Sequence, residues 1–208
     1  MRRSKGFTLI ELLAVIVILG VIMLIAIPSV TGYITSSRKN SFASTGANII
    51  DAVRKYAITA NGLPNYTGDK VVYRVVDQNG KIAVKLDSGG TKSAFGAAWK
   101  PGYNYVVIEA TDNNNYNYYY AGYDASGNFI PLTLEDELKG GVVQNVSELS
   151  DSETIDSKIF KLPTDDDDTT AWPGGVDFAD GYDISVEQDD SDLARLYRLY
   201  PNNGDVLL

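Results

Sequence analysis

Glu11 is the residue whose surroundings most clearly indicate a chemical role. It lies in a run from residue 7 to residue 27 in which 18 of 21 residues are hydrophobic. An ionised side chain among apolar neighbours is costly unless a positive group neutralises it. A segment that served only as an anchor would gain by losing this charge, so we expect Glu11 to form an ion pair.

The sequence offers little else for catalysis. The 208 residues include no cysteine and no histidine, which excludes disulfides and thiolate chemistry and removes the usual base near neutral pH. Carboxylates and tyrosines remain, but no spacing singles out a catalytic pair. We therefore predict a protein that is not an enzyme, with no catalytic residues and no cofactor.

Acidic stretches leave calcium as an alternative for the C-terminal third, because carboxylate oxygens ligate hard cations. Like charges also repel one another, so we interpret the run at 165–168 as a solvated loop and predict no metal site. The residues in question are Asp165, Asp166, Asp167 and Asp168, and further along Asp177, Asp180, Asp183 and Glu187.

A third acidic stretch begins at Asp124 and ends at Glu135, twelve positions apart as in an EF-hand loop. Its sixth position is Phe129, where such a loop needs glycine. The stretch therefore predicts a β-turn rather than a calcium site.

The N-terminal elements position Glu11 in a membrane. Arg2, Arg3 and Lys5 precede the apolar run, which as a helix spans roughly 31 Å and matches a hydrocarbon core of about 30 Å. The basic flank places the N-terminus in the cytoplasm and the rest outside. A cleaved secretory signal would have a shorter core and a small-residue site after it, which residues 26–28 do not supply.

The segment GFTLIELLAVIVILG, which opens with Gly6 and Phe7, resembles the processing and assembly signal of type IV prepilins and pilin-like pseudopilins. The shared pattern is a short basic leader ending in glycine, a hydrophobic residue, and a glutamate four residues after it. The resemblance implies that a membrane prepilin peptidase cuts after Gly6 and N-methylates Phe7. It also implies a bend at Pro28. It is specific over residues 1–30, moderate to about residue 60 and absent beyond.

Cleavage would give Glu11 its partner. The new α-amine of Phe7 would lie at the edge of an apolar helix, where the Glu11 carboxylate of a neighbouring subunit can neutralise it. Such pairing would also set the axial stagger between subunits. We therefore assign processing to Gly6 and Phe7, and assembly to Phe7, Glu11 and Pro28.

Beyond the membrane the pattern predicts a one-sided helix. Apolar or small residues recur at spacings of three and four, which is typical of a helix that packs on its own domain. The helix is predicted over residues 7–62, after a leader at 1–6, with the transmembrane part at 7–27. The recurring residues are Phe42, Gly46, Ile49, Val53, Tyr56 and Ala60.

Residues 63–208 then predict an extracellular head. Alternating β-formers indicate one hairpin from 71–76 and 82–86 and another from 103–111 and 116–123. We expect a short helix at 134–138 and strands near 157–162, 182–187 and 194–200. Five tyrosines between 116 and 123 are expected mainly to pack across strands. The fold class is α+β, a long N-terminal helix on an antiparallel sheet.

The acidic residues are concentrated at the end of the chain. Residues 134–208 hold 19 acidic and 5 basic residues, which argues against nucleic acid as a partner because phosphates would be repelled.

The sequence thus predicts a structural type IV pilus subunit. It would be a single-pass protein of the cytoplasmic membrane before assembly and part of an extracellular filament afterwards, with roles in adhesion, motility or DNA uptake. Its partners would be further copies of itself, the prepilin peptidase, the pilus assembly machinery and membrane lipid. The alternatives are a minor pilin or secretion-system pseudopilin, or a membrane-tethered extracellular binding protein that never polymerises.

Overall fold

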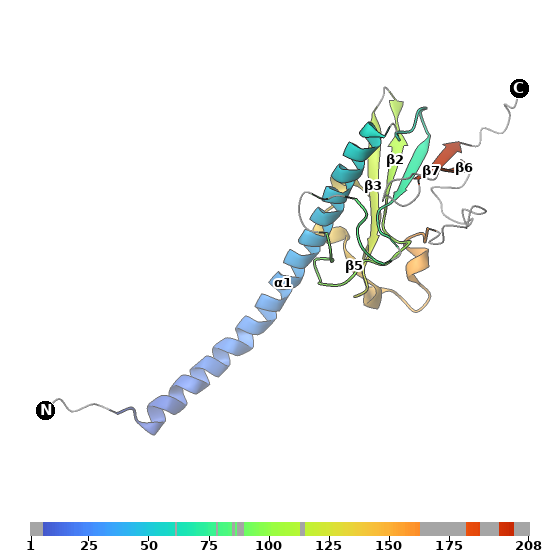
Figure 1. The fold of residues 1–208 in the computed structure, drawn as a ribbon. Helices are drawn as coiled ribbons and strands as arrows, with labels where there is room; N and C mark the ends of the chain where they lie inside the picture. The colour runs from blue at the N-terminus through green and yellow to red at the C-terminus, as the bar shows by residue number, and fades with distance from the viewer. Residues whose placement is uncertain are drawn as a thin grey trace, which may run out of the picture. The chain divides into compact units, whose positions relative to one another are not determined.

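The computed structural model describes residues 6–60, 62–77, 79–84, 86, 90–112 and 115–162, and the backbone of two strands at 182–187 and 196–201. The chain divides into two compact units, residues 1–38 and 39–208 (Figure 1). Among its described residues the first unit holds a short non-helical start at 6–8 and the first part of a helix, and the second unit holds the rest of that helix and the sheet.

Helix α1 runs from Leu9 to Thr59 with Pro28 inside it. It therefore begins two residues later than expected and ends before residue 62. At its end the Gly62 N–H donates to the Ala57 carbonyl over 2.9 Å, and the Tyr73 hydroxyl donates to the Gly62 carbonyl over 2.7 Å. Proline removes one backbone donor, yet the helix continues through Pro28.

Within the second unit, α1 buries one face. Its buried residues are Phe42, Ala43, Gly46, Ile49, Ile50, Val53 and Ala57. The predicted stripe is correct at its first four positions, whereas Tyr56 is half-buried and Ala60 is exposed. The deviation arises at the C-terminal end, where Ala57 takes the inward position and the helix stops at Thr59.

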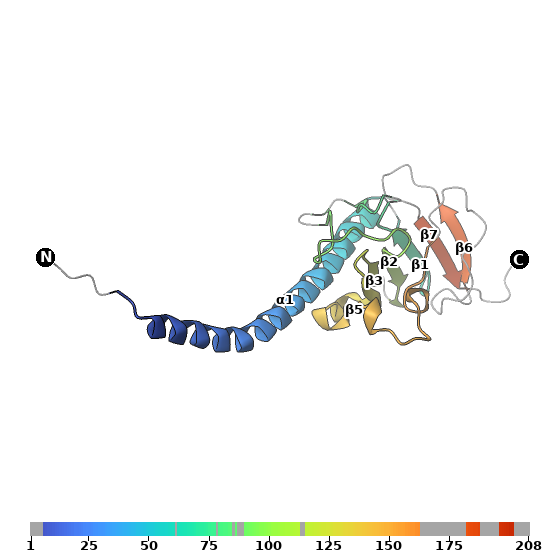
Figure 2. The same cartoon turned by 90° about the horizontal axis from the view of Figure 1, so that it is seen from below.

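Seven strands in the described part of the chain form one antiparallel sheet in the order β5-β4-β3-β2-β1-β7-β6. This confirms the α+β fold class. Figure 2 shows β1 beside β2, with β7 and β6 beyond it. The strands are β1 (Lys70–Arg74), β2 (Tyr105–Ala110), β3 (Tyr116–Tyr123), β4 (Asn128–Leu134), β5 (Gln144–Asn145), β6 (Tyr182–Glu187) and β7 (Leu196–Pro201).

The first predicted hairpin is confirmed at its turn but not as a pair of strands. Strand β1 pairs with β2 on one side and with β7 on the other, Val72 lying opposite Val107 and Tyr197. The described residues of 82–86 form no strand, although Ile82 forms an isolated antiparallel bridge with Val76 and the Ala83 N–H donates to the Val75 carbonyl over 2.9 Å. Four of the five residues of β1 are buried, as expected for a strand that has a neighbour on each side.

The second predicted hairpin is confirmed, since β2 and β3 pair from Tyr105↔Ala121 to Ala110↔Tyr116. The short helix near 134–138 is a 3₁₀ turn, η2 (Glu135–Glu137). The strand expected near 157–162 is wrong, because that stretch contains the end of η5 (Ile155–Ser157) and no strand. Strands β6 and β7 lie where strands were expected.

The sheet separates two hydrophobic clusters. The first lies between α1 and the sheet and includes Tyr120 and Trp99, which lies against Phe42 with ring centroids 5.2 Å apart. The second includes Tyr105 and Phe129 and is covered by Ile159 and Leu162. The tyrosines of β3 alternate between them, as cross-strand packing requires.

Gly46 sets the distance between α1 and the sheet. A Cβ placed there would lie 2.6 Å from Cδ1 of Tyr120, whose ring is fully buried and whose hydroxyl contacts Asn104 Oδ1 over 3.3 Å. The ring is therefore held at both ends and has little room to move. Close approach of helix and sheet at this point requires glycine.

We expect Gly46→Ala to destabilise the head by about 1–2 kcal/mol. The gain of up to about 1 kcal/mol in helix propensity is outweighed by overpacking against Tyr120. Urea unfolding of the full chain in detergent, followed by near-UV circular dichroism, measures the difference. Gly141→Ala is the matched control because nothing lies within 4 Å of its added Cβ. Equal stability of the two variants would contradict this packing.

The buried tyrosines predict alkaline unfolding. Burial raises the pKa of Tyr105 and Tyr120 well above the ordinary value of 10. Their contribution to stability is therefore present below pH 10 and is lost as the pH rises above it. In an absorbance titration at 295 nm, we expect part of the 14 tyrosines to ionise only together with loss of the near-UV dichroism. A single transition near pH 10 with the fold intact would be inconsistent with this burial.

Candidate processing and assembly site

The junction between Gly6 and Phe7 is open. Residues 6–8 precede the helix, and the Phe7 side chain is 85% exposed. A Cβ added at Gly6 would have no heavy atom within 4 Å. The peptide bond predicted to be cut therefore lies in exposed chain outside the helix, where a peptidase can reach it.

Thr8 and Glu11 form a capping box at the start of α1. The Thr8 N–H and hydroxyl donate to Glu11 Oε2 over 2.8 and 2.9 Å, and the Glu11 N–H donates to Thr8 Oγ1 over 3.3 Å. Two backbone donors that the first helical turn cannot satisfy are thereby paired. Glu11 is held at a defined place by its own chain.

Thr8 is the site residue that the sequence reasoning missed. The signal was present, because a Ser or Thr three residues before a Glu at the start of an apolar run is the pattern of a capping box. The charge of Glu11 indicates an ion pair but does not by itself indicate Thr8 as a hydrogen-bonding partner.

The cap leaves part of the Glu11 carboxylate open. Both bonds from Thr8 reach Oε2, and Oε1 receives none from the described residues. Glu11 also forms no ion pair within the described part of the chain. The capped carboxylate can thus accept a bond from a positive group of another molecule without the helix start being broken.

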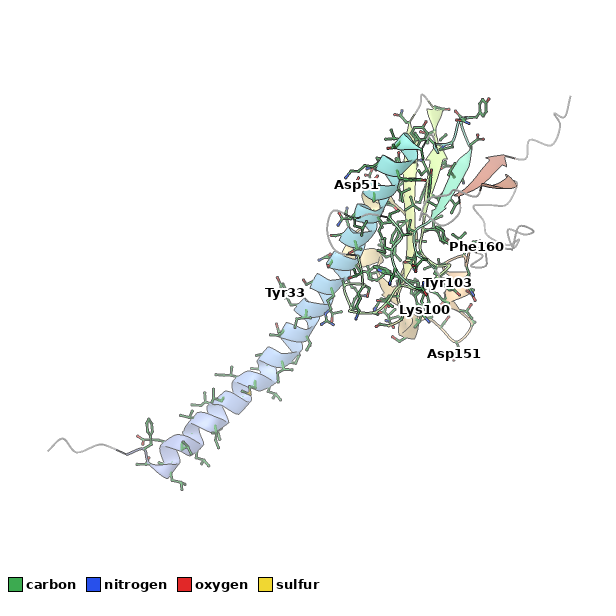
Figure 3. The ribbon with its side chains drawn as sticks, viewed as in Figure 1. Tyr33, Asp51, Lys100, Tyr103, Asp151 and Phe160 are labelled. Carbon is green, nitrogen blue, oxygen red and sulfur yellow. The ribbon has the colours of Figure 1, made fainter. Side chains whose placement is uncertain are left out.

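The helix around Glu11 is apolar on every side. The large hydrophobic residues of residues 9–34 are all exposed, and Figure 3 shows their side chains standing out around the first part of α1. By length and composition the helix could cross a membrane. Pro28 lies at the end of this apolar part, where the Thr31 hydroxyl donates to its carbonyl over 3.0 Å.

Most of the acidic residues considered for a calcium site lie outside the described residues. Residues 165–168, Asp177 and Asp180 lie outside the described residues, as do the side chains of Asp183 and Glu187. Among the described residues, no group of three or more acidic, histidine or cysteine side chains could hold a metal ion.

Asp124 is a structural residue. It is fully buried and accepts from the Ser93 hydroxyl over 2.6 Å and from the N–H groups of Ser126 and Asn128 over 2.9 Å each. The Gly127 N–H donates to the Asp124 carbonyl over 3.2 Å. The predicted β-turn at the start of the EF-hand-like spacing is therefore present, and the carboxylate closes it.

Comparison with known proteins finds two similarities, and the first of them lies at the N-terminus. Residues 1–27 match the model of the prokaryotic N-terminal methylation motif. Over 62 residues the chain is 37% identical to the type IV narrow pilus major component PilA5 of Thermus thermophilus. This match covers 30% of the chain and 53% of the relative, so the chain spans about half the relative's length. No solved structure matches the chain.

The methylation motif covers the open Gly6-Phe7 junction, the capped Glu11 and the apolar helix. The chain thus carries the prokaryotic N-terminal methylation motif and is similar over 62 residues to a type IV pilus component.

Proposed function

We propose that this chain is a structural subunit of a type IV pilus that polymerises through its N-terminal helix and displays residues 39–208 outside the cell. A membrane prepilin peptidase removes residues 1–6 and methylates Phe7. The subunit then waits in the cytoplasmic membrane with its N-terminus inside, until the assembly machinery extracts it.

The observation that carries this proposal is a capped carboxylate on a helix that is apolar on all sides. A protein tether needs an apolar helix but no charge within it. The free-energy cost of the Glu11 carboxylate in an apolar environment is offset only if a positive group pairs with it there. The amine of Phe7 on a neighbouring copy is such a group, and it exists only after cleavage at the open junction.

The exposed apolar surface of α1 can be buried either in lipid or against other helices in a filament. Exposed apolar side chains on all sides of a helix require an apolar environment, either hydrocarbon or other helices. Coaxial bundling of many copies would replace lipid contacts with helix contacts, and the Phe7–Glu11 pairs would set the register between copies. Adhesion, motility or DNA uptake would then be carried by the displayed heads.

The composition supports a structural role rather than an enzymatic one. The chain lacks the histidine and cysteine on which much neutral-pH catalysis relies. The surplus of acidic residues in 134–208 opposes contact with nucleic acid phosphates.

Mass spectrometry of filaments sheared from the cell surface tests the proposed function. We expect this chain as an abundant component. Its presence as a trace component would favour a minor pilin or pseudopilin, and its absence from filaments, with the protein retained in the membrane, would favour the tethered binding protein.

The mature chain is expected to begin at Phe7 with one methyl group. Gly6→Val should block cleavage, because a β-branched side chain intrudes where the peptidase approaches the backbone. Gly32→Val is the matched control, since it also adds a side chain with nothing within 4 Å but leaves the junction intact. N-terminal peptide masses read out both variants, and a mature chain beginning at Met1 or after Ala26 would refute the assignment.

Glu11→Gln should abolish or severely reduce filaments while leaving cleavage and membrane insertion intact. The glutamine keeps the length of the side chain and can still cap the helix. The neighbour's amine, however, is buried without a counter-charge at a cost of about 3–5 kcal/mol per subunit.

Asp51→Asn provides the control for Glu11→Gln, because it removes one exposed carboxylate from the same helix within the head. Surface filaments and mature membrane-bound subunit are measured in the same cells. Normal filament yield from Glu11→Gln would make the carboxylate incidental and support the tethered protein instead.

A further inference from the structure

The helix changes character immediately after the apolar span. Past Pro28, apolar side chains continue on one side only, at Val30, Tyr33 and Ile34, whose spacings of three and four place them on one face. Their exposed fractions are 54%, 79% and 44%, and Figure 3 shows Tyr33 projecting from the helix. We call these three residues the interfacial stripe.

The adjacent side of this turn is hydroxylated. The Thr31 hydroxyl donates to the Pro28 carbonyl and the Thr35 hydroxyl to the Thr31 carbonyl, both over 3.0 Å. These side chains have backbone partners and impose no need for another ligand. The segment is therefore amphipathic, in contrast to the helix before Pro28, which is apolar on every side.

The distance of the interfacial stripe from the end of the apolar span determines which layer of the membrane it contacts. If the hydrocarbon ends at Ile27, Val30 lies roughly 4.5 Å and Tyr33 roughly 9 Å further along the axis. The headgroup zone of one leaflet is about 5–7 Å thick. Side chains on a helix lean toward its N-terminus, which here is the direction of the membrane, and helix tilt brings the stripe lower still.

We propose that the interfacial stripe binds the headgroup–acyl boundary of the outer leaflet of the cytoplasmic membrane, with Arg38 directed at lipid phosphate. A tyrosine ring prefers this boundary because its body is apolar and its hydroxyl is polar. Arg38 is exposed and lies one turn beyond Ile34, so its long side chain can reach back toward anionic headgroups. The stripe fixes the depth of the subunit before extraction.

This inference rests on the proposed function only in requiring that residues 7–27 enter the membrane. The chain has no cysteine, so single cysteines carrying a spin label can report depth position by position. The labels are placed at 30 and 34 on the stripe and at 31 and 35 on the hydroxylated side. A label at 16 reports membrane insertion, and one at 48 reports the solvated head.

The full-length chain is reconstituted in vesicles of phosphatidylcholine and phosphatidylglycerol at three to one. Accessibility to a water-soluble nickel chelate is compared with accessibility to oxygen. We expect labels at 30 and 34 to be several-fold less accessible to the chelate than labels at 31 and 35. Tyr33→Ser should raise chelate access at 34, whereas the matched Thr35→Ser should not.

Omitting phosphatidylglycerol should reduce the protection at 34, and Arg38→Gln should remove that lipid dependence. Equal access at 30, 31, 34 and 35 with position 16 protected would overturn the stripe while leaving membrane insertion standing. Chelate access at 16 would instead contradict insertion itself, and the stripe with it, so the two failures are distinguishable.

Discussion

An apolar helix surface that none of the described residues covers is the constraint on which this protein depends. Before Pro28, the large hydrophobic side chains of α1 are exposed on every side, and water is an unfavourable environment for all of them. The surface must be covered by lipid or by other helices. Glu11 makes the choice between them specific, because a carboxylate is costly in lipid and becomes acceptable when a positive group pairs with it.

The part of α1 within residues 39–59 has a different distribution of apolar side chains. There only one face is apolar, and the sheet of the same chain covers it. The close approach at Gly46 and Tyr120 sets this contact, and the Arg54 guanidinium stacks over the Tyr118 ring at 4.3 Å while pairing with Glu135. One continuous helix thus presents an exposed apolar surface in one unit and part of an intramolecular core in the other.

What the sequence predicted well depended on a strong periodic or local signal. The apolar run, the helical stripe from Phe42 to Val53 and the β2–β3 hairpin follow from spacing alone, and the methylation motif is a local pattern. The pairing partner of the strand at Val71 to Val76 was predicted wrongly, because this pattern fits a hairpin arm and a central strand equally well. Only the long-range pairing of β1 with β7, more than 120 positions away, distinguishes the two.

Other features lay outside the reach of periodicity. The 3₁₀ turns between residues 135 and 157 are too short to give a period, and the strand expected near 157–162 is replaced by chain whose Ile159 and Leu162 cover the back of the sheet. The sequence contains the pattern of a capping box. The burial of a charge among apolar residues predicts an ion pair for Glu11, but it does not predict that Glu11 accepts hydrogen bonds from Thr8.

A reconstruction of the filament at side-chain resolution tests the central claim most directly, through the distance between the Phe7 α-nitrogen of one subunit and the Glu11 carboxylate of a neighbour. Our account predicts that these atoms lie within hydrogen-bonding distance, about 2.7–2.9 Å for a charged pair, with residues 7–27 enclosed by other copies. A filament in which Glu11 contacts only Thr8 of its own chain, and Phe7 lies far from every carboxylate, would contradict it.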